Sequence, residues 1–253
     1  MLYAFITAML TAVSCTNDIP ANVTGDTSEN TSEDTSEDTS EGTSGSGSGD
    51  LSGNSGKISI VASVASQTRT PQLGSDGSGS FEKGDKMTLC ITGGAAPVVT
   101  DYAYEVDFLQ WPDFGLSEDV SQVTFSACYP TQKVEQDGTF EFNSFKSSYD
   151  DLLLAAAQPV EVGTSEAVSL TFRHALHRLN LEIQPGKGYT EDDLSQLSCI
   201  FSAKTTCVVD AVKGSVKEVK DEQGSLTVTG AKASFYLVPQ ATDGISFTLT
   251  LGG

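Results

Sequence analysis

The sequence predicts an all-β protein in which two β-sandwich domains follow a disordered N-terminal linker. From Lys57 onward, apolar side chains alternate with small or polar ones in many short segments, the pattern of strands with one face on a core. Clusters of Gly, Pro, Asn and Asp separate these segments and indicate tight turns. Signals for long helices are weak, so strands account for most of the predicted order.

A short apolar run opens the chain, from Leu2 to Val13, and a small residue joins it to Cys15. The run has the length of a signal-peptide core and is too short to cross a bilayer as a helix. No Lys or Arg precedes it. We predict a lipoprotein signal peptide over residues 1–15, with cleavage before Cys15 and a lipid on its thiol that anchors the mature protein to a membrane. The alternative is a frayed apolar N-terminus.

Residues 16–56 are of low complexity and repeat Thr, Ser, Glu and Asp before a Gly/Ser run. They include nine acidic residues and no Lys or Arg, so we expect a disordered linker that holds a folded domain clear of a lipid surface. The whole chain has 14 basic and 34 acidic residues and a formal charge of −20. This balance excludes nucleic acid as a partner, because phosphate binding needs clustered Lys and Arg.

The ordered part divides where the alternation breaks, near Pro159 to Glu166, into an N-terminal sandwich over 57–162 and a C-terminal sandwich over 163–253. Alternation predicts these core-facing side chains: Ile58, Ile60, Ala62 and Val64; Met87, Leu89 and Ile91; Val123, Phe125 and Ala127; Phe140 and Phe142; Val168, Leu170 and Phe172; Leu179, Leu181 and Ile183; Leu226 and Val228; Phe235 and Leu237; Ile245, Phe247, Leu249 and Leu251.

Three local signals add detail to the predicted strands. Asp137-Gly138 is typical of a hairpin turn. Tyr129-Pro130 predicts the end of a strand, because proline cannot donate to the ladder. Thr190, followed by three acidic residues, predicts an N-cap and two turns of helix to Leu197.

The residue types that usually carry chemistry are sparse. With no nucleophile, zinc-protease or P-loop motif, we predict no catalytic residue, no metal site and no cofactor, and hence no enzyme. His174 and His177 lack a third ligand at metal-binding spacing, so we expect structural roles for both. Two disulfides and buried free thiols are both open for the remaining cysteines: Cys90, Cys128, Cys199 and Cys207.

Aromatic residues gather between positions 102 and 114 and form a candidate ligand loop for a glycan or a host protein. Its candidate stacking residues are Tyr102, Tyr104 and Trp111. The alternative is a loop that folds back on the sandwich and buries these rings.

Five segments, in order along the chain, carry a family resemblance. The sequence resembles the fimbrillin-like proteins, which are subunits of type V pili, over nearly everything from Lys57 to the end. The segments are Phe81–Leu89, Phe125–Pro130, Asp151–Ala155, Leu170–Leu179 and Tyr236–Gln240.

The resemblance implies tandem Greek-key (transthyretin-like) sandwiches and a lipoprotein at the outer membrane, the cell surface or the fimbrium. In the family the first strand is removed by proteolysis after an Arg, and a strand from another pilus subunit enters the vacated groove by β-strand addition. Arg69 is then the candidate cleavage position. The candidate exchanged strand carries four alternating side chains, Ile58, Ile60, Ala62 and Val64. The chain ends at Gly253 directly after a strand, so either the sequence is truncated or the protein accepts a strand without donating one.

The predicted function is a fimbrial subunit or a pilus accessory or anchoring lipoprotein. A surface lipoprotein that binds glycans or host ligands without polymerising is the alternative, and an enzyme ranks last.

Overall fold

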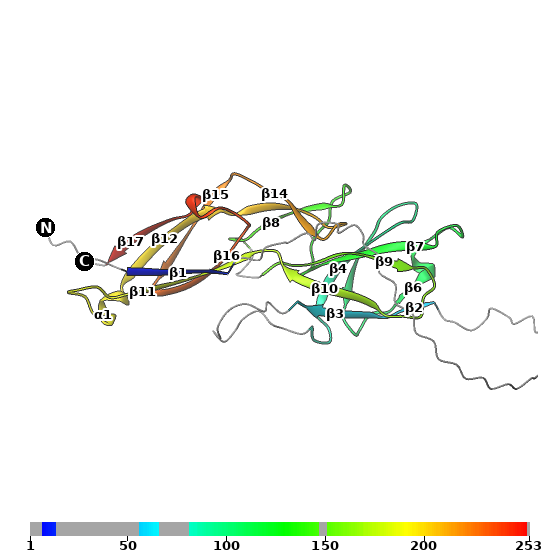
Figure 1. Cartoon of the computed structure of the whole chain (residues 1–253), viewed down its shortest axis with the longest axis horizontal. Coiled ribbons are helices and arrows are strands. Elements are labelled where there is room, and N and C mark those ends of the chain that lie inside the picture. The colour runs from blue at the N-terminus through cyan, green and yellow to red at the C-terminus, as the bar shows by residue number, and fades with distance from the viewer. Residues whose placement is uncertain (1–6, 14–55, 66–80, 147–150, 252–253) are drawn as a thin grey trace, which may run out of the picture. The chain divides into compact units, whose positions relative to one another are not determined.

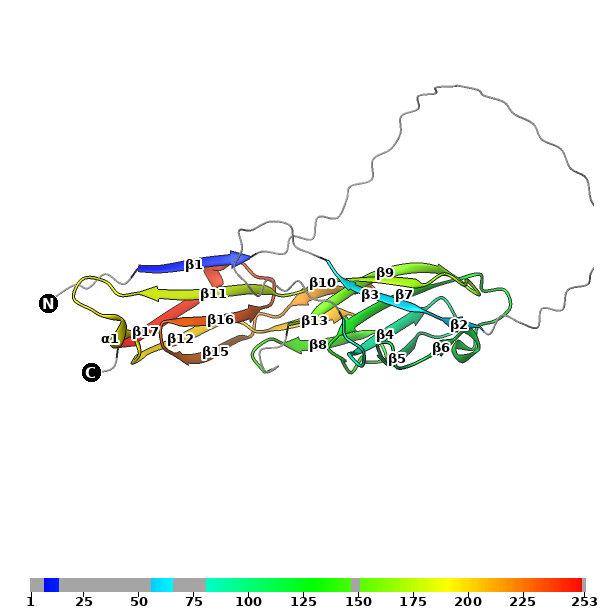
Figure 2. The same ribbon diagram turned by 90° about the horizontal axis from the view of Figure 1, so that it is seen from below.

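The computed structural model of the chain describes residues 56–65, 81–146 and 151–251, and the backbone of residues 7–13 (Figures 1 and 2). Strands dominate these residues, with one helix of four residues and two short 3-10 segments. The all-β fold class is thereby confirmed. None of the helices in the described part is long and apolar enough to span a membrane.

The largest sheet has six strands, in the order β3-β10-β9-β7-β4-β5. Its neighbours pair antiparallel except for β3, which runs parallel to β10 at one edge. The bounds are β3 Ile60–Val64, β4 Lys86–Thr92, β5 Val98–Ala103, β7 Gln122–Tyr129, β9 Leu153–Glu161 and β10 Val168–His174.

A small second layer covers one end of this sheet. The two-residue strands β2 (Lys57–Ile58) and β6 (Leu109–Gln110) pair antiparallel, and a 3-10 turn, η1 (Trp111–Phe114), follows β6 directly. The apolar side chains of this layer enclose a core with the inner face of the sheet. That core is Ile58, Ile60, Met87, Leu89, Ile91, Tyr102, Leu109, Trp111, Phe114, Val123, Phe125, Ala127, Ala155, Val168, Leu170 and Phe172.

Three three-stranded sheets complete the described residues, in the orders β14-β13-β8, β1-β11-β16 and β15-β12-β17. Every pair in them is antiparallel. The bounds are β1 Thr7–Val13, β8 Thr139–Asn143, β11 His177–Gln184, α1 Glu191–Leu194, β12 Leu197–Lys204, β13 Thr206–Asp210, β14 Ser215–Val219, β15 Gln223–Thr229, β16 Lys232–Leu237, η2 Thr242–Gly244 and β17 Ser246–Leu251.

Strands from both sides of position 162 share sheets. β10 follows that position yet joins the six-stranded sheet, and β8 precedes it yet pairs with β13. A buried hydrogen bond also joins the two parts, because Ser126 Oγ donates to the Ala211 carbonyl at 2.7 Å. The described residues from Gly56 onward cluster as one compact unit, so the division at 162–163 stays a prediction.

β9 runs through Pro159 to Glu161 and pairs Pro159 with Thr124 of β7, so the strand itself continues across the position where the alternation is predicted to break. A proline in a sheet needs a position where its missing N–H is not required. β10 pairs with β9 only over Leu153–Ala155, so Pro159 has a strand partner on one side only among the described residues. The alternation of buried and exposed side chains is lost within β9, where residues 156–159 are all exposed, and the strand ends before Gly163, whose φ is 81°.

The three local signals agree more closely with the structure. Gly138, at φ 78°, donates to the Glu135 carbonyl at 3.0 Å, which confirms a tight turn. β7 ends at Tyr129 as Pro130 predicts. Thr190 is the N-cap of α1, but the helix makes a single turn rather than two, because β12 begins at Leu197.

Candidate strand-exchange site

The segment from Gly56 to Ala65 contains all four side chains of the candidate exchanged strand. Ile58 and Ile60 are 4% and 7% exposed and belong to the core of the six-stranded sheet. Ala62 and Val64 are half-buried. These four side chains therefore face inward as predicted. The segment is not one strand, however, because Ser59 separates β2 from β3.

Each half of the segment has its own backbone partner. The Trp111 N–H donates to the Gly56 carbonyl at 2.7 Å, and β2 pairs Ile58 with Leu109 of β6. After Ser59 the chain continues as β3 beside β10, in parallel register from Ile60 opposite Val168 to Val64 opposite Phe172 (Figure 1). β3 ends the strand order of its sheet, so among the described residues its ladder is one-sided.

Arg69 and Cys15 lie outside the described residues. Arg69 is four positions beyond Ala65, where description of the segment stops. Residues 7–13, which fall inside the predicted signal peptide, form β1 and pair along β11 from Thr7 opposite Gln184 to Val13 opposite Arg178 (Figure 2). Cleavage before Cys15 would remove this strand, and it stays a prediction. The linker over 16–56 lies outside the described residues except for Gly56.

The residues of the candidate ligand loop are placed mostly inside. Tyr102 and Trp111 are buried in the core, and Tyr104 is half-buried. Burial raises the pKa of Tyr102, and nearby acidic side chains add to that rise. Phe108, in the same stretch, is 68% exposed, and Lys57 Nζ lies 4.3 Å from its ring centroid. Among the Phe, Tyr and Trp residues of the described part, Phe108 is the one that is exposed.

The two histidines occupy structural surroundings. His174 Nδ1 pairs with Asp151, and both side chains are largely buried. His177 begins β11, and burial lowers its pKa. No group of three or more His, Cys, Asp or Glu side chains within the described ranges is arranged to hold a metal ion.

The four cysteines are free and buried. Burial raises the pKa of the Cys90 thiol to about 11 and that of the Cys128 and Cys207 thiols to about 12. It also raises the pKa of the Cys199 thiol. A thiol that stays protonated is a poor nucleophile. Among the two alternatives open from the sequence, the structure has the buried free thiols.

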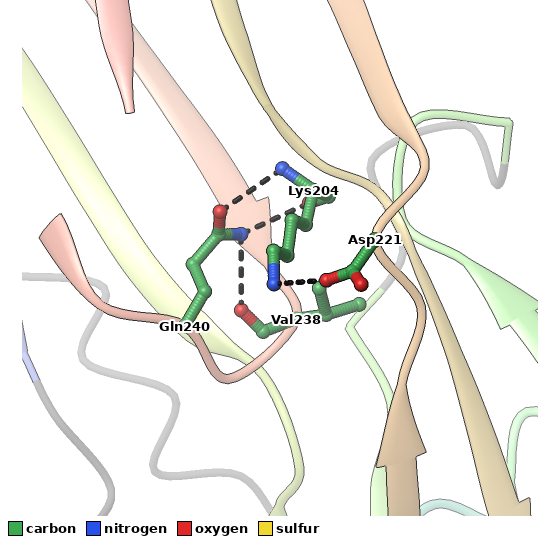
Figure 3. Close-up of polar contacts among 4 residues, drawn as sticks. All are labelled: Lys204, Asp221, Val238 and Gln240. Atoms are coloured by element: carbon green, nitrogen blue, oxygen red, sulfur yellow. Dashed lines mark hydrogen bonds and ion pairs between the residues drawn. The ribbon is translucent and has the colours of Figure 1, made fainter. Parts of the chain in front are cut away.

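Two of the family-like motifs have clear structural roles. In the first, Gly84 adopts φ 96° and Asp85 accepts from the Glu82 N–H at 2.8 Å, so the chain turns sharply into β4. In the second, the side-chain amide of Gln240 bonds to both backbone groups of Lys204, as a neighbouring strand would (Figure 3). Its oxygen accepts from the Lys204 N–H and its nitrogen donates to the Lys204 carbonyl, both at 2.9 Å.

Gln240 also ties two strand ends together. Its Nε2 donates to the Val238 carbonyl at 3.2 Å, just beyond the end of β16, while Lys204 ends β12. The Lys204 ammonium then reaches Asp221 at 2.7 Å, at a position where Asp221 is almost fully exposed (Figure 3). The sequence marked this residue only through the family resemblance, because nothing in the local pattern shows what a polar side chain after a strand will contact.

The chain matches a known protein family. A family model described as fimbrillin-like matches residues 68–253. The chain therefore belongs to the fimbrillin-like family. A search of curated proteins finds no significant match.

Solved structures of similar fold are described as "putative cell adhesion protein". The one from Bacteroides uniformis has a TM-score of 0.52 at 19% identity, over 78% of this chain and 81% of that chain. The one from Bacteroides thetaiotaomicron has a TM-score of 0.48 at 19% identity, over 78% and 82%. The family supports a fimbrial protein with a cell-surface or fimbrial location, in a family of structural proteins rather than enzymes. The Bacteroides uniformis structure shows that the fold is shared.

Proposed function

We propose that this protein is a fimbrial subunit or pilus accessory lipoprotein that accepts a β-strand from another pilus subunit in place of the segment 56–65. The observation that carries the proposal is that this segment pairs at the edge of a sheet while its apolar side chains enter the core. β3 lies at a sheet edge, while Ile58 and Ile60 insert into the core beneath it. An extended strand from a partner that supplies the same main-chain bonds and two apolar anchors could take this position.

The energetics favour exchange once the chain is cut. Burial of two isoleucine side chains contributes roughly 3–6 kcal/mol to holding the segment in place. In the intact chain, the covalent connection keeps the segment at a high effective concentration at its site. Cleavage after Arg69 removes that connection on the C-terminal side, so the segment becomes a separable ligand of modest affinity. The family match begins at residue 68, just beyond this segment.

Membrane attachment through Cys15 completes the proposal. Before cleavage after Arg69, the lipid would hold the protein at the outer membrane, and the acidic linker would carry the folded part away from the surface. Exchange of the cut segment would release the folded part from this anchor. Mass spectrometry of the mature N-terminus from membranes is the test of this part. A lipid-modified residue 15 is the expected result, and an intact Met1 contradicts it.

Limited proteolysis with an Arg-specific enzyme tests the exchange. We expect a cut at Arg69 in the folded protein, followed by association of the cut form with added partner subunits. An Arg69→Lys variant should resist the cut and stay monomeric, which makes it the matched control. Resistance of the native chain at Arg69, or a cut form that stays monomeric with partner present, would show that strand exchange is the wrong mechanism.

One observation favours a second function, the binding of a glycan or host ligand without polymerisation. Phe108 is 68% exposed and holds Lys57 over its ring, which joins a stacking surface to a cation. A glycan array probed with the native chain and with Phe108→Ala decides this alternative. Binding that the substitution abolishes supports it, and no binding by the native chain removes it.

A further inference from the structure

Trp111 carries a buried hydrogen-bond donor that is not used. Its side chain is 8% exposed and packs edge-on against Phe114 and Phe125, with ring centroids 6.1 and 6.3 Å away. The indole Nε1 is fully buried and has no hydrogen-bond partner among the described residues. Buried tryptophan N–H groups normally find an acceptor, and an unmet donor weakens the state that contains it.

Gly56 is in contact with Trp111. Its carbonyl accepts from the Trp111 backbone N–H at 2.7 Å. A Cβ built on Gly56 would lie 3.5 Å from Trp111 Cδ1, the ring atom bonded to Nε1, and 3.4 Å from Pro112 Cδ. These are ordinary contact distances, and the backbone of Gly56 is not in the left-handed region. A side chain therefore fits here, next to the donor that has no acceptor.

Gly56 also shares the alternation of the candidate exchanged strand, since positions 56, 58 and 60 are two apart. The resident segment thus offers two apolar anchors, Ile58 and Ile60, and no side chain at the position that faces the indole. Its seating is further limited by the interruption at Ser59 and by the parallel pairing of β3, which is slightly weaker per residue than antiparallel pairing.

We infer that the strand that occupies this site in the assembled state carries a hydrogen-bond acceptor in the position of Gly56, two residues before the first of its two apolar anchors. Ser, Thr, Asn and Asp supply such an acceptor, so the partner strand reads acceptor–x–apolar–x–apolar. The inference rests on the proposed strand exchange. Trp111 is then a specificity-determining residue, which makes the resident glycine-bearing segment the weaker occupant and the partner strand the stronger one.

Gly56→Ser and Gly56→Ala in the full chain test the local chemistry. Both substitutions change backbone freedom alike and both fill the space, so their difference isolates the hydroxyl acceptor. We expect Ser to stabilise the folded state about fivefold in the unfolding equilibrium constant relative to Ala. The indole Hε1 resonance should shift downfield in Ser only. In the Trp111→Phe background the Ser–Ala difference should vanish. Equal behaviour of Ser and Ala in both measurements overturns the inference, as does a difference that persists without the indole.

Peptide exchange on the chain cut at Arg69 separates the inference from the proposed function. The probes are two synthetic peptides of residues 56–64, one with the native Gly56 and one with Ser in its place. We expect the Ser peptide to displace the resident segment about fivefold more effectively. If both peptides displace it equally, strand exchange stands and the inference is overturned. If neither displaces it, the proposed strand exchange fails and the inference fails with it.

Discussion

Replacing Ile60 with alanine measures how firmly the segment 56–65 is held. Ile60 is 7% exposed and lies in the core opposite Val168, which is also buried. Truncation of a buried isoleucine to alanine costs about 2–5 kcal/mol. The lower end applies here because the site is at a sheet edge, where neighbouring chain can close over the space. A loss of about 2 kcal/mol lowers the corresponding equilibrium constant by about 30-fold.

The adjacent residue provides a matched control. Val61 is 49% exposed on the opposite face of β3, so Val61→Ala should change the unfolding free energy by less than about 0.5 kcal/mol, or about twofold. Both variants lose methyl groups from neighbouring positions of one strand. Their difference therefore reports burial rather than strand propensity.

Denaturant unfolding followed by Trp111 fluorescence is the assay, because this residue is the single tryptophan and its backbone N–H is bonded to the Gly56 carbonyl. In the chain cut at Arg69, the same variants should release the segment in the same order. Equal losses in Ile60→Ala and Val61→Ala would refute the reasoning, since the segment would then not be anchored by its inward side chains.

The remaining predictions concern other parts of the fold. Burial raises the pKa of the Cys90, Cys128 and Cys207 thiols above the unfolded value of 9.0, so their contribution to stability is present below pH 9 and is lost as pH rises toward 11 to 12. Alkaline denaturation and thiol alkylation should therefore begin at the same pH. Alkylation of the native protein at pH 8 would contradict this prediction. Gln240→Ala should lower the unfolding free energy by about 1–3 kcal/mol, because it leaves the Lys204 backbone groups without their partner, whereas Asp221→Asn should leave the denaturation midpoint unchanged. Deleting residues 1–14 should speed amide hydrogen exchange along β11 on the side that pairs with β1, and unchanged protection there would show that β1 contributes nothing to that edge.

The all-β class and the inward face of the strands could be predicted from local patterns in the chain. Alternation has a period of two, which is a property of the extended backbone, so the buried positions of Leu170 and Phe172 follow from the pattern alone. The turn at Gly138 and the N-cap at Thr190 were also predictable, because each depends on a few neighbouring residues. The inward orientation of Ile58 and Ile60 belongs to the same class of prediction.

Strand pairing could not be predicted in the same way, because it depends on residues distant in the chain. The alternation of the segment 56–65 reads as one strand, but the change of partner from β6 to β10 divides it at Ser59. Pro159 reads as a break, but β9 continues through it where one side has no strand partner among the described residues. The sequence left two interpretations of Trp111 open, a stacking platform and, favoured over it, a ring folded back on the sandwich. Its burial, and the glycine that leaves its N–H without an acceptor, follow from the meeting of two segments more than fifty residues apart.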